Sequence, residues 1–225
     1  MKSHPALAFV LPFVLYLLGV TLAAKAGPYY PWAYASVAAL VAIACWYLLR
    51  GRALFAVHGR IGMPILVGFV GVSLWIFLCE LKLEQSIAAY LPEWLRGAER
   101  KGFNPFEQLK SPWATWSFIA ARLFGIAIIV PIAEELFWRG FLLRWLIGDE
   151  WEELSIGTCT PKSFLLVTLL FTAAHPEWFA AAAYCVLLNF YVWKTKDLWG
   201  CIVAHATSNF ALSIYIMATG SWWLW

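Results

Sequence analysis

Six polar side chains in the C-terminal half of the chain have the types and spacing needed to activate a water molecule. They are Glu134, Glu135, Arg139, His175, His205 and Asn209. Residues four apart share one face of a helix, so Glu135 can pair with Arg139. His205 and Asn209 have the same spacing and can both point into one cavity. A carboxylate, two histidines and an amide donor could deprotonate water, directly or on a metal ion, and stabilise a tetrahedral oxyanion.

The adjacent carboxylates Glu134 and Glu135 point about 100° apart on a helix, so only one of them can face Arg139 well. The other is free for chemistry. A purely structural ion pair between Glu135 and Arg139 is the alternative interpretation of this pattern. It explains one carboxylate but gives no role to Glu134, to the two histidines or to Asn209.

Two prolines next to these groups predict breaks in their helices. Pro131 lacks the N–H that would bond the carbonyl of Ala127, so we expect a kink that opens space for water or substrate. Pro176 disfavours the helical conformation at His175, so the helix that carries this histidine is expected to end there.

The elements that position these groups must be membrane helices. Of the 225 residues, 63% are hydrophobic and only 13% are charged, whereas a soluble domain has nearer a quarter of charged residues. Seven apolar segments lie near residues 5–24, 30–49, 61–81, 114–140, 163–175, 179–193 and 198–219. A helix needs about 20 apolar residues to cross the hydrocarbon core. Because the segments also lack the alternation of barrel strands, we predict an all-α polytopic bundle of about seven transmembrane helices, within a range of six to eight.

These segments use most of the chain. We therefore expect a single integral membrane domain over residues 1–225, with a catalytic core over residues 114–219. The first segment, which follows Lys2 and precedes Ala24-Lys25-Ala26, also has the layout of a cleavable signal peptide. Its length favours a retained helix.

Aromatic and cysteine residues receive structural interpretations. Many of the 15 tryptophans stand near segment ends, which is typical of an interfacial aromatic belt. They include Trp32, Trp46, Trp113, Trp193, Trp199, Trp222, Trp223 and Trp225. Cys45, Cys79, Cys185 and Cys201 fall in or at the ends of apolar segments without paired spacing, so we interpret them as small buried hydrophobic residues and expect no disulfide.

Charge indicates the partners and the orientation of the bundle. A net charge of +3, dispersed along the chain, does not suggest nucleic acid, and the predicted partner is the lipid bilayer. One side of the bundle carries Lys2, Arg50, Arg52, Arg60, Arg144, Lys162, Lys194 and Lys196. On the other side, most basic residues lie in the segment 82–110, where glutamates are interleaved. The positive-inside rule then favours a cytoplasmic N-terminus, in the inner (cell) membrane of a bacterium.

Three motifs around the polar side chains resemble those of a known family. Residues 134–139 match EExxxR, residues 171–175 match FxxxH, and residues 205–209 match HxxxN. In this order and on separate hydrophobic segments, they resemble the CAAX protease and bacteriocin-processing (CPBP) family of intramembrane endoproteases, which includes CAAX prenyl proteases. The resemblance covers roughly residues 114–219, so the first three predicted helices lie outside it.

The resemblance implies a role for each group. Glu134 would be the general base that activates water, with His175 as its partner, while His205 and Asn209 would bind the oxyanion. Glu135 would support the site and pair with Arg139 as a structural residue.

The family leaves metal dependence open, because its members have been described both as metalloproteases and as glutamate-dependent proteases. A divalent metal such as zinc would be bound by Glu134, His175 and His205. The chain has no HExxH motif, and its two motif histidines lie on different segments, so spacing does not decide between the two mechanisms.

The implied activity is hydrolysis of a peptide bond near the C-terminus of a prenylated or otherwise membrane-associated protein. A non-catalytic scaffold or immunity-type protein of the same family is the alternative, and a transporter or proton relay is a third. The presence of all six motif residues favours the enzyme, and the lack of an internal repeat disfavours the transporter.

Aromatic residues near the motifs could line a lipid-accessible groove or pack helices together. They are Phe137, Trp138, Phe171 and Trp178.

Overall fold

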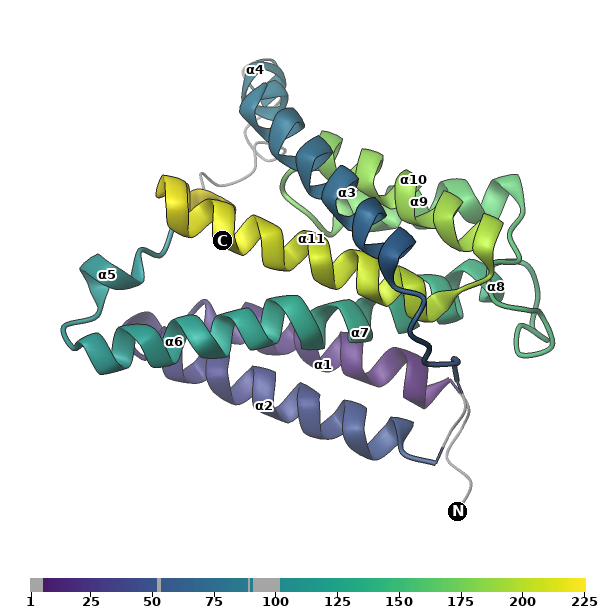
Figure 1. Ribbon diagram of the computed structural model, residues 1–225, viewed down its shortest axis with the longest axis horizontal. Helices are drawn as coiled ribbons and strands as arrows, with labels where there is room; N and C mark the ends of the chain where they lie inside the picture. Colours follow the sequence, from purple (N-terminus) through teal and green to yellow (C-terminus); the bar gives the residue numbers. More distant parts are fainter. Residues whose placement is uncertain (1–5, 52–53, 89, 91–101) are drawn as a thin grey trace.

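The chain folds as a bundle of helices (Figure 1). The computed structural model describes residues 6–51, 54–88, 90 and 102–225, and every regular element within them is helical. Six helices of the bundle are α1 (Leu7–Ala23), α2 (Tyr30–Leu49), α3 (Gly62–Glu80), α9 (Pro161–Ala173), α10 (Trp178–Thr195) and α11 (Leu198–Thr219). The seventh runs through α6 (Pro112–Phe124), η3 (Gly125–Ile129), α7 (Val130–Glu135), η4 (Leu136–Leu142) and α8 (Leu143–Trp145). Shorter elements are η1 (Gly27–Tyr29), α4 (Leu83–Ala88), α5 (Pro105–Gln108) and η5 (Trp222–Leu224).

The predicted all-α membrane bundle is confirmed, although its helices differ in length. Within the described residues, four stretches are long and apolar enough to cross a membrane: Gly27–Leu49, Gly62–Ile87, Pro112–Trp145 and Leu198–Thr219. The apolar helices α1 and α9 are shorter. With 13 residues, α9 is about 20 Å long and does not by itself cross a hydrocarbon core of about 30 Å.

The helix that carries the adjacent glutamates is longer than hydropathy predicted, since it extends from Pro112 to Trp145. Two of its segments, η3 and η4, are π-helical and flank the glutamates on either side. A π turn holds more residues than an α turn, and such turns are frequent at functional sites. The expected disturbance near Pro131 therefore takes the form of a π-helical turn just before it.

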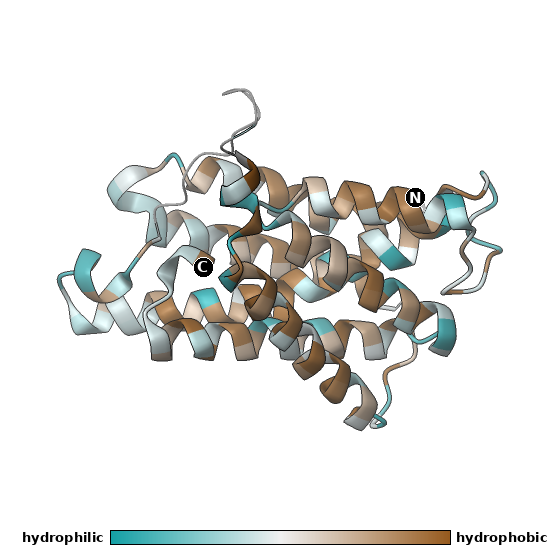
Figure 2. Cartoon of the chain, turned by 90° about the horizontal axis from the view of Figure 1, so that it is seen from above, coloured by the Kyte–Doolittle hydropathy of each residue, from teal (hydrophilic) through white to brown (hydrophobic). Residues whose placement is uncertain are grey.

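The helices lie along the long axis of the molecule. In Figure 1, α1, α2 and α6 lie on one side, α3, α9 and α10 lie on the other, and α11 lies between them. Helix α1 begins at one end of the bundle, and the chain finishes toward the other end (Figures 1 and 2). Figure 2 shows hydrophobic residues along the helices and most hydrophilic residues near the two ends, as expected of helices surrounded by lipid.

Two glycines let α3 approach its neighbours closely. A Cβ at Gly68 would lie 2.6 Å from the carbonyl oxygen of Ala204, and one at Gly71 would lie 2.5 Å from the ring of Tyr184. The Ser208 hydroxyl donates a hydrogen bond of 2.8 Å to the Gly68 carbonyl. Small residues at such contacts are typical of packed membrane helices. They hold α3 against α11 and bring the ring of Tyr184 into the centre of the bundle.

Candidate active site

A cavity of about 280 Å³ lies inside the bundle, between α1, α3, the long helix with the two glutamates, α9, α10 and α11. Its polar lining comprises Tyr16, Arg122, Glu134, His175, Glu177, Tyr184, His205, Ser208 and Asn209. Most of the remaining lining is apolar or aromatic. The fold therefore brings Glu134, His175, His205 and Asn209 to one cavity, as the motifs predicted, whereas Glu135 and Arg139 lie outside its lining.

The cavity lies toward one end of the bundle. It is lined by Leu17 and Val20 near the end of α1, by Trp75 near the end of α3, and by Leu212 and Trp225 near the end of the chain. His175 lines it from just beyond the end of α9. The opposite ends of these helices contribute no lining residue.

Glu134 is the carboxylate that faces this cavity. Its residue surface is only 7% exposed, and its buried Oε2 has no hydrogen-bond partner among the described residues. Two other buried groups of the cavity lining, the Trp138 Nε1 and the Tyr184 hydroxyl, also have no partner there. Buried polar groups are normally bonded to protein or to water. This part of the wall therefore contains an acceptor and two donors that are not bonded to any described residue.

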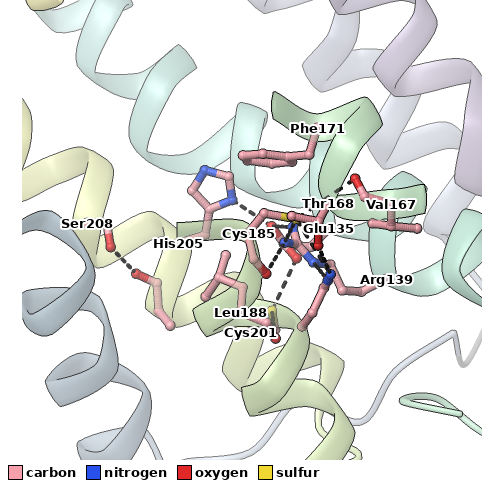
Figure 3. A network of polar contacts seen from close by, with 12 residues as sticks. Glu135, Arg139, Val167, Thr168, Phe171, Cys185, Leu188, Cys201, His205 and Ser208 are labelled. Carbon is pink, nitrogen blue, oxygen red and sulfur yellow. Dashed lines mark hydrogen bonds and ion pairs between the residues drawn. The ribbon is translucent and has the colours of Figure 1, made fainter. Parts of the chain in front are cut away.

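Glu135 is in the opposite situation, since both of its oxygens are bonded and it is completely buried. Its Oε1 accepts hydrogen bonds from Arg139 Nη1 at 2.9 Å and from His205 Nδ1 at 2.7 Å. Its Oε2 accepts one from the Cys201 thiol at 3.1 Å. Figure 3 shows these partners converging on the carboxylate from different helices. The predicted pairing with Arg139 is confirmed, and it leaves Glu135 no oxygen for substrate.

Arg139 extends this network to two further helices. Its Nε donates to the Oδ1 of Asn189 at 2.9 Å, and the Asn189 amide nitrogen donates to the Thr168 hydroxyl at 3.3 Å. Its Nη2 donates to Cys185, at 3.4 Å from the carbonyl oxygen and 3.2 Å from the sulfur. The guanidinium also lies over the Phe171 ring, 5.2 Å from its centroid. A charge removed from water is tolerated only with such partners, so the network holds α9, α10 and α11 around the two glutamates.

The chain leaves helix α9 at Ala173, and His175 follows in the turn before α10, as Pro176 predicted. Its Nδ1 lies 2.8 Å from the Phe171 carbonyl oxygen. Because a carbonyl oxygen only accepts, this bond puts the proton on Nδ1 and leaves Nε2 of the neutral ring as an acceptor. The ring is stacked on Phe171 with centroids 4.4 Å apart and meets the edge of Trp75 at 5.9 Å. These contacts fix the orientation of the imidazole in the cavity wall.

The imidazole of His205 joins the bonded network to the cavity. Since the Glu135 carboxylate accepts at 2.7 Å, Nδ1 of His205 carries the proton of that bond. The other nitrogen, Nε2, remains for the cavity that the residue lines. A carboxylate behind a histidine fixes the tautomer and the orientation of its ring.

Asn209 is positioned by the π turn of the facing helix. Its Nδ2 donates to the carbonyl oxygen of Ile126 at 3.0 Å. In this turn the Val130 N–H bonds to the carbonyl of Gly125, five residues earlier. The next residue in that register is Pro131, which has no N–H for the carbonyl of Ile126. The amide of Asn209 takes the place of this missing donor, and one Nδ2–H bond remains for the cavity.

The predicted metal ligands Glu134, His175 and His205 line the same cavity, and binding of zinc by them stays a prediction. Within the described ranges, no three His, Cys, Asp or Glu side chains are grouped so that they could hold a metal ion. The chemistry below is derived from the side chains alone.

Several residues of the site were missed by the sequence interpretation. Cys185 and Cys201 are polar partners of the buried ion pair and not merely small hydrophobic residues, and Thr168 also belongs to the network. Trp225 was grouped with the interfacial belt, but it lines the cavity. A thiol or hydroxyl in an apolar segment has no spacing signal of its own, so these contacts become visible only when the helices are assembled.

The aromatic residues near the motifs divide between the two predicted roles. Trp138 and Phe171 line the cavity. Phe137 instead packs on helix α1, where its ring is stacked on Phe13 with centroids 4.3 Å apart. Trp178 is the first residue of α10 and is not part of the cavity lining.

Comparison with protein families agrees with the motifs. Residues 115–211 match the family described as Rce1-like, type II CAAX prenyl endopeptidase. This range includes all four motif residues of the cavity and both members of the buried ion pair, and it excludes α1, α2 and α3. No curated protein and no solved structure matches the chain.

Proposed function

We propose that this chain hydrolyses peptide bonds inside the membrane. The premise is that it belongs, through residues 115–211, to the Rce1-like family of type II CAAX prenyl endopeptidases. Its substrate would be a prenylated or otherwise membrane-associated protein, cut near the C-terminus. One observation carries the proposal: Glu134 has a carboxylate oxygen with no partner among the described residues, and it lines one cavity together with His175, His205 and Asn209.

In the proposed reaction, Glu134 acts as the general base. It takes a proton from a water molecule as the water oxygen attacks the scissile carbonyl carbon, with the acceptor nitrogen of His175 helping to orient the water. The carbonyl oxygen becomes a tetrahedral oxyanion. When the C–N bond breaks, the proton held by Glu134 passes to the leaving amine, which restores the carboxylate.

The oxyanion would be stabilised from α11. Asn209 offers the remaining N–H of its side-chain amide, and His205 offers Nε2–H when its ring is doubly protonated next to Glu135. The Glu135 carboxylate is fully bonded, so it acts on the reaction through the orientation and charge of His205. We therefore assign Glu135 a positioning role and Glu134 the catalytic one.

The first experiment measures cleavage by the purified full-length protein in liposomes. The substrates are a panel of prenylated CAAX peptides and unmodified peptides, assayed with and without a chelator. We expect Glu134→Gln and His175→Ala to abolish cleavage, whereas Glu107→Gln, a matched change at an exposed carboxylate outside the cavity, retains it. Loss of cleavage in the presence of the chelator would assign a metal to the reaction.

The alternative is a non-catalytic scaffold of the same family. A protein that keeps its helical circular dichroism and its bound lipid, yet cuts none of the peptides in any lipid mixture, would overturn the endopeptidase and favour the scaffold. A protein that cuts equally well with Glu134→Gln would keep the activity and overturn the residue assignment.

A further inference from the structure

The cavity has a second charged end that the hydrolytic reaction does not use. Arg122 lines the same cavity as Glu134, twelve residues earlier on the same helix. In the described part of the chain, no carboxylate lies within ion-pair distance of its guanidinium. An arginine inside a membrane helix costs about 2.5–3.5 kcal/mol on insertion scales, so an unpaired one calls for a function.

Neutral groups hold this cation in place. Its Nη1 donates to the Tyr30 hydroxyl at 3.0 Å, and the guanidinium lies over the Tyr34 ring, 4.4 Å from the centroid. Tyr34 is 1% exposed and lies so close to Gly125 that a Cβ there would be 2.4 Å from its hydroxyl oxygen. The side chain is therefore stacked on a fixed platform at the start of the π turn, which limits its freedom to leave the cavity.

Donors remain available at this end. A guanidinium has five N–H groups, and Tyr30 and Tyr34 are the neighbours that its N–H groups contact, so part of this donor set remains for a ligand. The Trp225 indole lies 6.0 Å from the guanidinium, and its buried Nε1 has no partner among the described residues. Stacking on Tyr34 covers one face of the guanidinium and leaves its edge, which matches the two oxygens of a carboxylate.

The separation of the two ends sets the length of a ligand that would contact both. Twelve residues of helix correspond to about 18 Å along its axis. An extended peptide advances at most about 3.3–3.6 Å per residue, so about five residues are needed to span this distance. The wall between the ends includes Leu17, Val20 and Ile126, which suit apolar side chains.

We propose that Arg122 binds the free C-terminal carboxylate of the peptide substrate and so sets where the chain is cut. This inference rests on the proposed endopeptidase function and adds to it a residue that recognises the C-terminal carboxylate of the substrate. The scissile bond is then about five residues from the C-terminus, because Glu134 and Arg122 contact one extended segment. A lipid phosphate at Arg122 would satisfy the charge without relating it to Glu134, so the shared cavity favours the peptide.

The test compares peptides of identical sequence that end in a free carboxylate or in an amide. We expect the wild-type protein to have a kcat/KM at least about ten-fold higher for the free acid, since hydrogen bonds to charged groups are worth about 1.5–3 kcal/mol. Arg122→Gln should bring this ratio close to one, and Arg122→Lys should restore part of it. Arg50→Gln is the matched control, because Arg50 also stacks on aromatic rings but is exposed and outside the cavity.

A binding arm keeps this inference separate from the activity. The fluorescently labelled acid and amide peptides are titrated onto Glu134→Gln protein with and without Arg122→Gln, in neutral and in anionic liposomes. Tighter binding of the acid that depends on Arg122 supports the inference even if no peptide is ever cut. Equal binding of acid and amide by protein with Arg122 overturns it, and a dependence on anionic lipid that Arg122→Gln removes would assign the site to a lipid headgroup instead.

Discussion

Two regions of the molecule, one on either side of the adjacent glutamates, differ in whether their buried polar groups have hydrogen-bond partners. Behind the cavity, Glu135, Arg139 and Asn189 are fully buried and joined by hydrogen bonds of 2.9 Å. At the cavity wall, Glu134 and Tyr184 are nearly as buried but have polar atoms without partners among the described residues. A fold that satisfies one set of groups and leaves its neighbours unsatisfied keeps the second set for a ligand.

The comparison predicts the largest effect at Glu134. Glu134→Gln should lower kcat by about 10²- to 10⁴-fold, the usual contribution of a general base, and should leave the thermal unfolding temperature in detergent nearly unchanged, because no bond between described residues is lost. Parallel melting curves and initial rates check this. A large drop in melting temperature would mean that Glu134 belongs to the structural region and would break the comparison.

Arg139 should show the opposite profile. Arg139→Met leaves the buried Glu135 carboxylate without its ion pair, so we expect a loss of about 3–5 kcal/mol in the free energy of unfolding. Adding Glu135→Gln to the same protein should recover part of this loss, because the uncompensated charge is then gone. Denaturant titration in detergent measures both, with Arg50→Met as the exposed control; equal stability of the single and double variants would contradict the ion-pair explanation.

Asn209 lies on the boundary and should show both effects. Asn209→Ala removes one proposed oxyanion donor, for which we expect about a 10²- to 10³-fold loss in kcat. It also leaves the Ile126 carbonyl without its donor, which costs about 1–3 kcal/mol of stability. Rates and unfolding measured on the same preparation test the pair of losses. An unchanged rate with reduced stability would place Asn209 wholly in the structural region.

Cys201 should give the smallest change. Cys201→Ala removes one thiol hydrogen bond to Glu135 while Arg139 and His205 still bind that carboxylate, so we expect about 1 kcal/mol of destabilisation and nearly full activity. Chemical denaturation checks the first, and peptide cleavage the second. A large loss of activity would show that the bonds from Arg139 and His205 are not enough to orient Glu135, and that the Cys201 thiol is also needed.

Sequence interpretation reached the fold because hydropathy marks membrane helices strongly. The structure places α2 and α11 at the predicted residues 30–49 and 198–219. The spacing of Glu135 and Arg139 also predicted their ion pair, since neighbours on one helix follow from helical periodicity alone. Contacts of this local kind are the ones that a single sequence encodes directly.

The remaining features depend on how separate helices meet. Spacing paired Glu135 with Arg139, but it could not show that α11 supplies His205 and Cys201 to the same carboxylate. The π turn before Pro131 was expected only as a kink, because its hydrogen-bond partner, Asn209, lies on another helix. Trp225 was likewise assigned to the interfacial belt because it stands near a segment end, but in the folded chain it lines the cavity.

The displacement of the cavity toward one end of the bundle determines the compartment from which a substrate arrives. The cavity lies where α1, α3, α9 and α11 end, whereas Arg50, Arg60, Arg144, Lys162, Lys194 and Lys196 lie at or near the other end. The positive-inside rule assigns the basic end to the cytoplasm, so we predict that the active site is entered by proteins that have already been exported. Reporter fusions at the α2–α3 connection and after α11 check this, since a cytoplasmic signal from the second fusion would reverse the direction of entry.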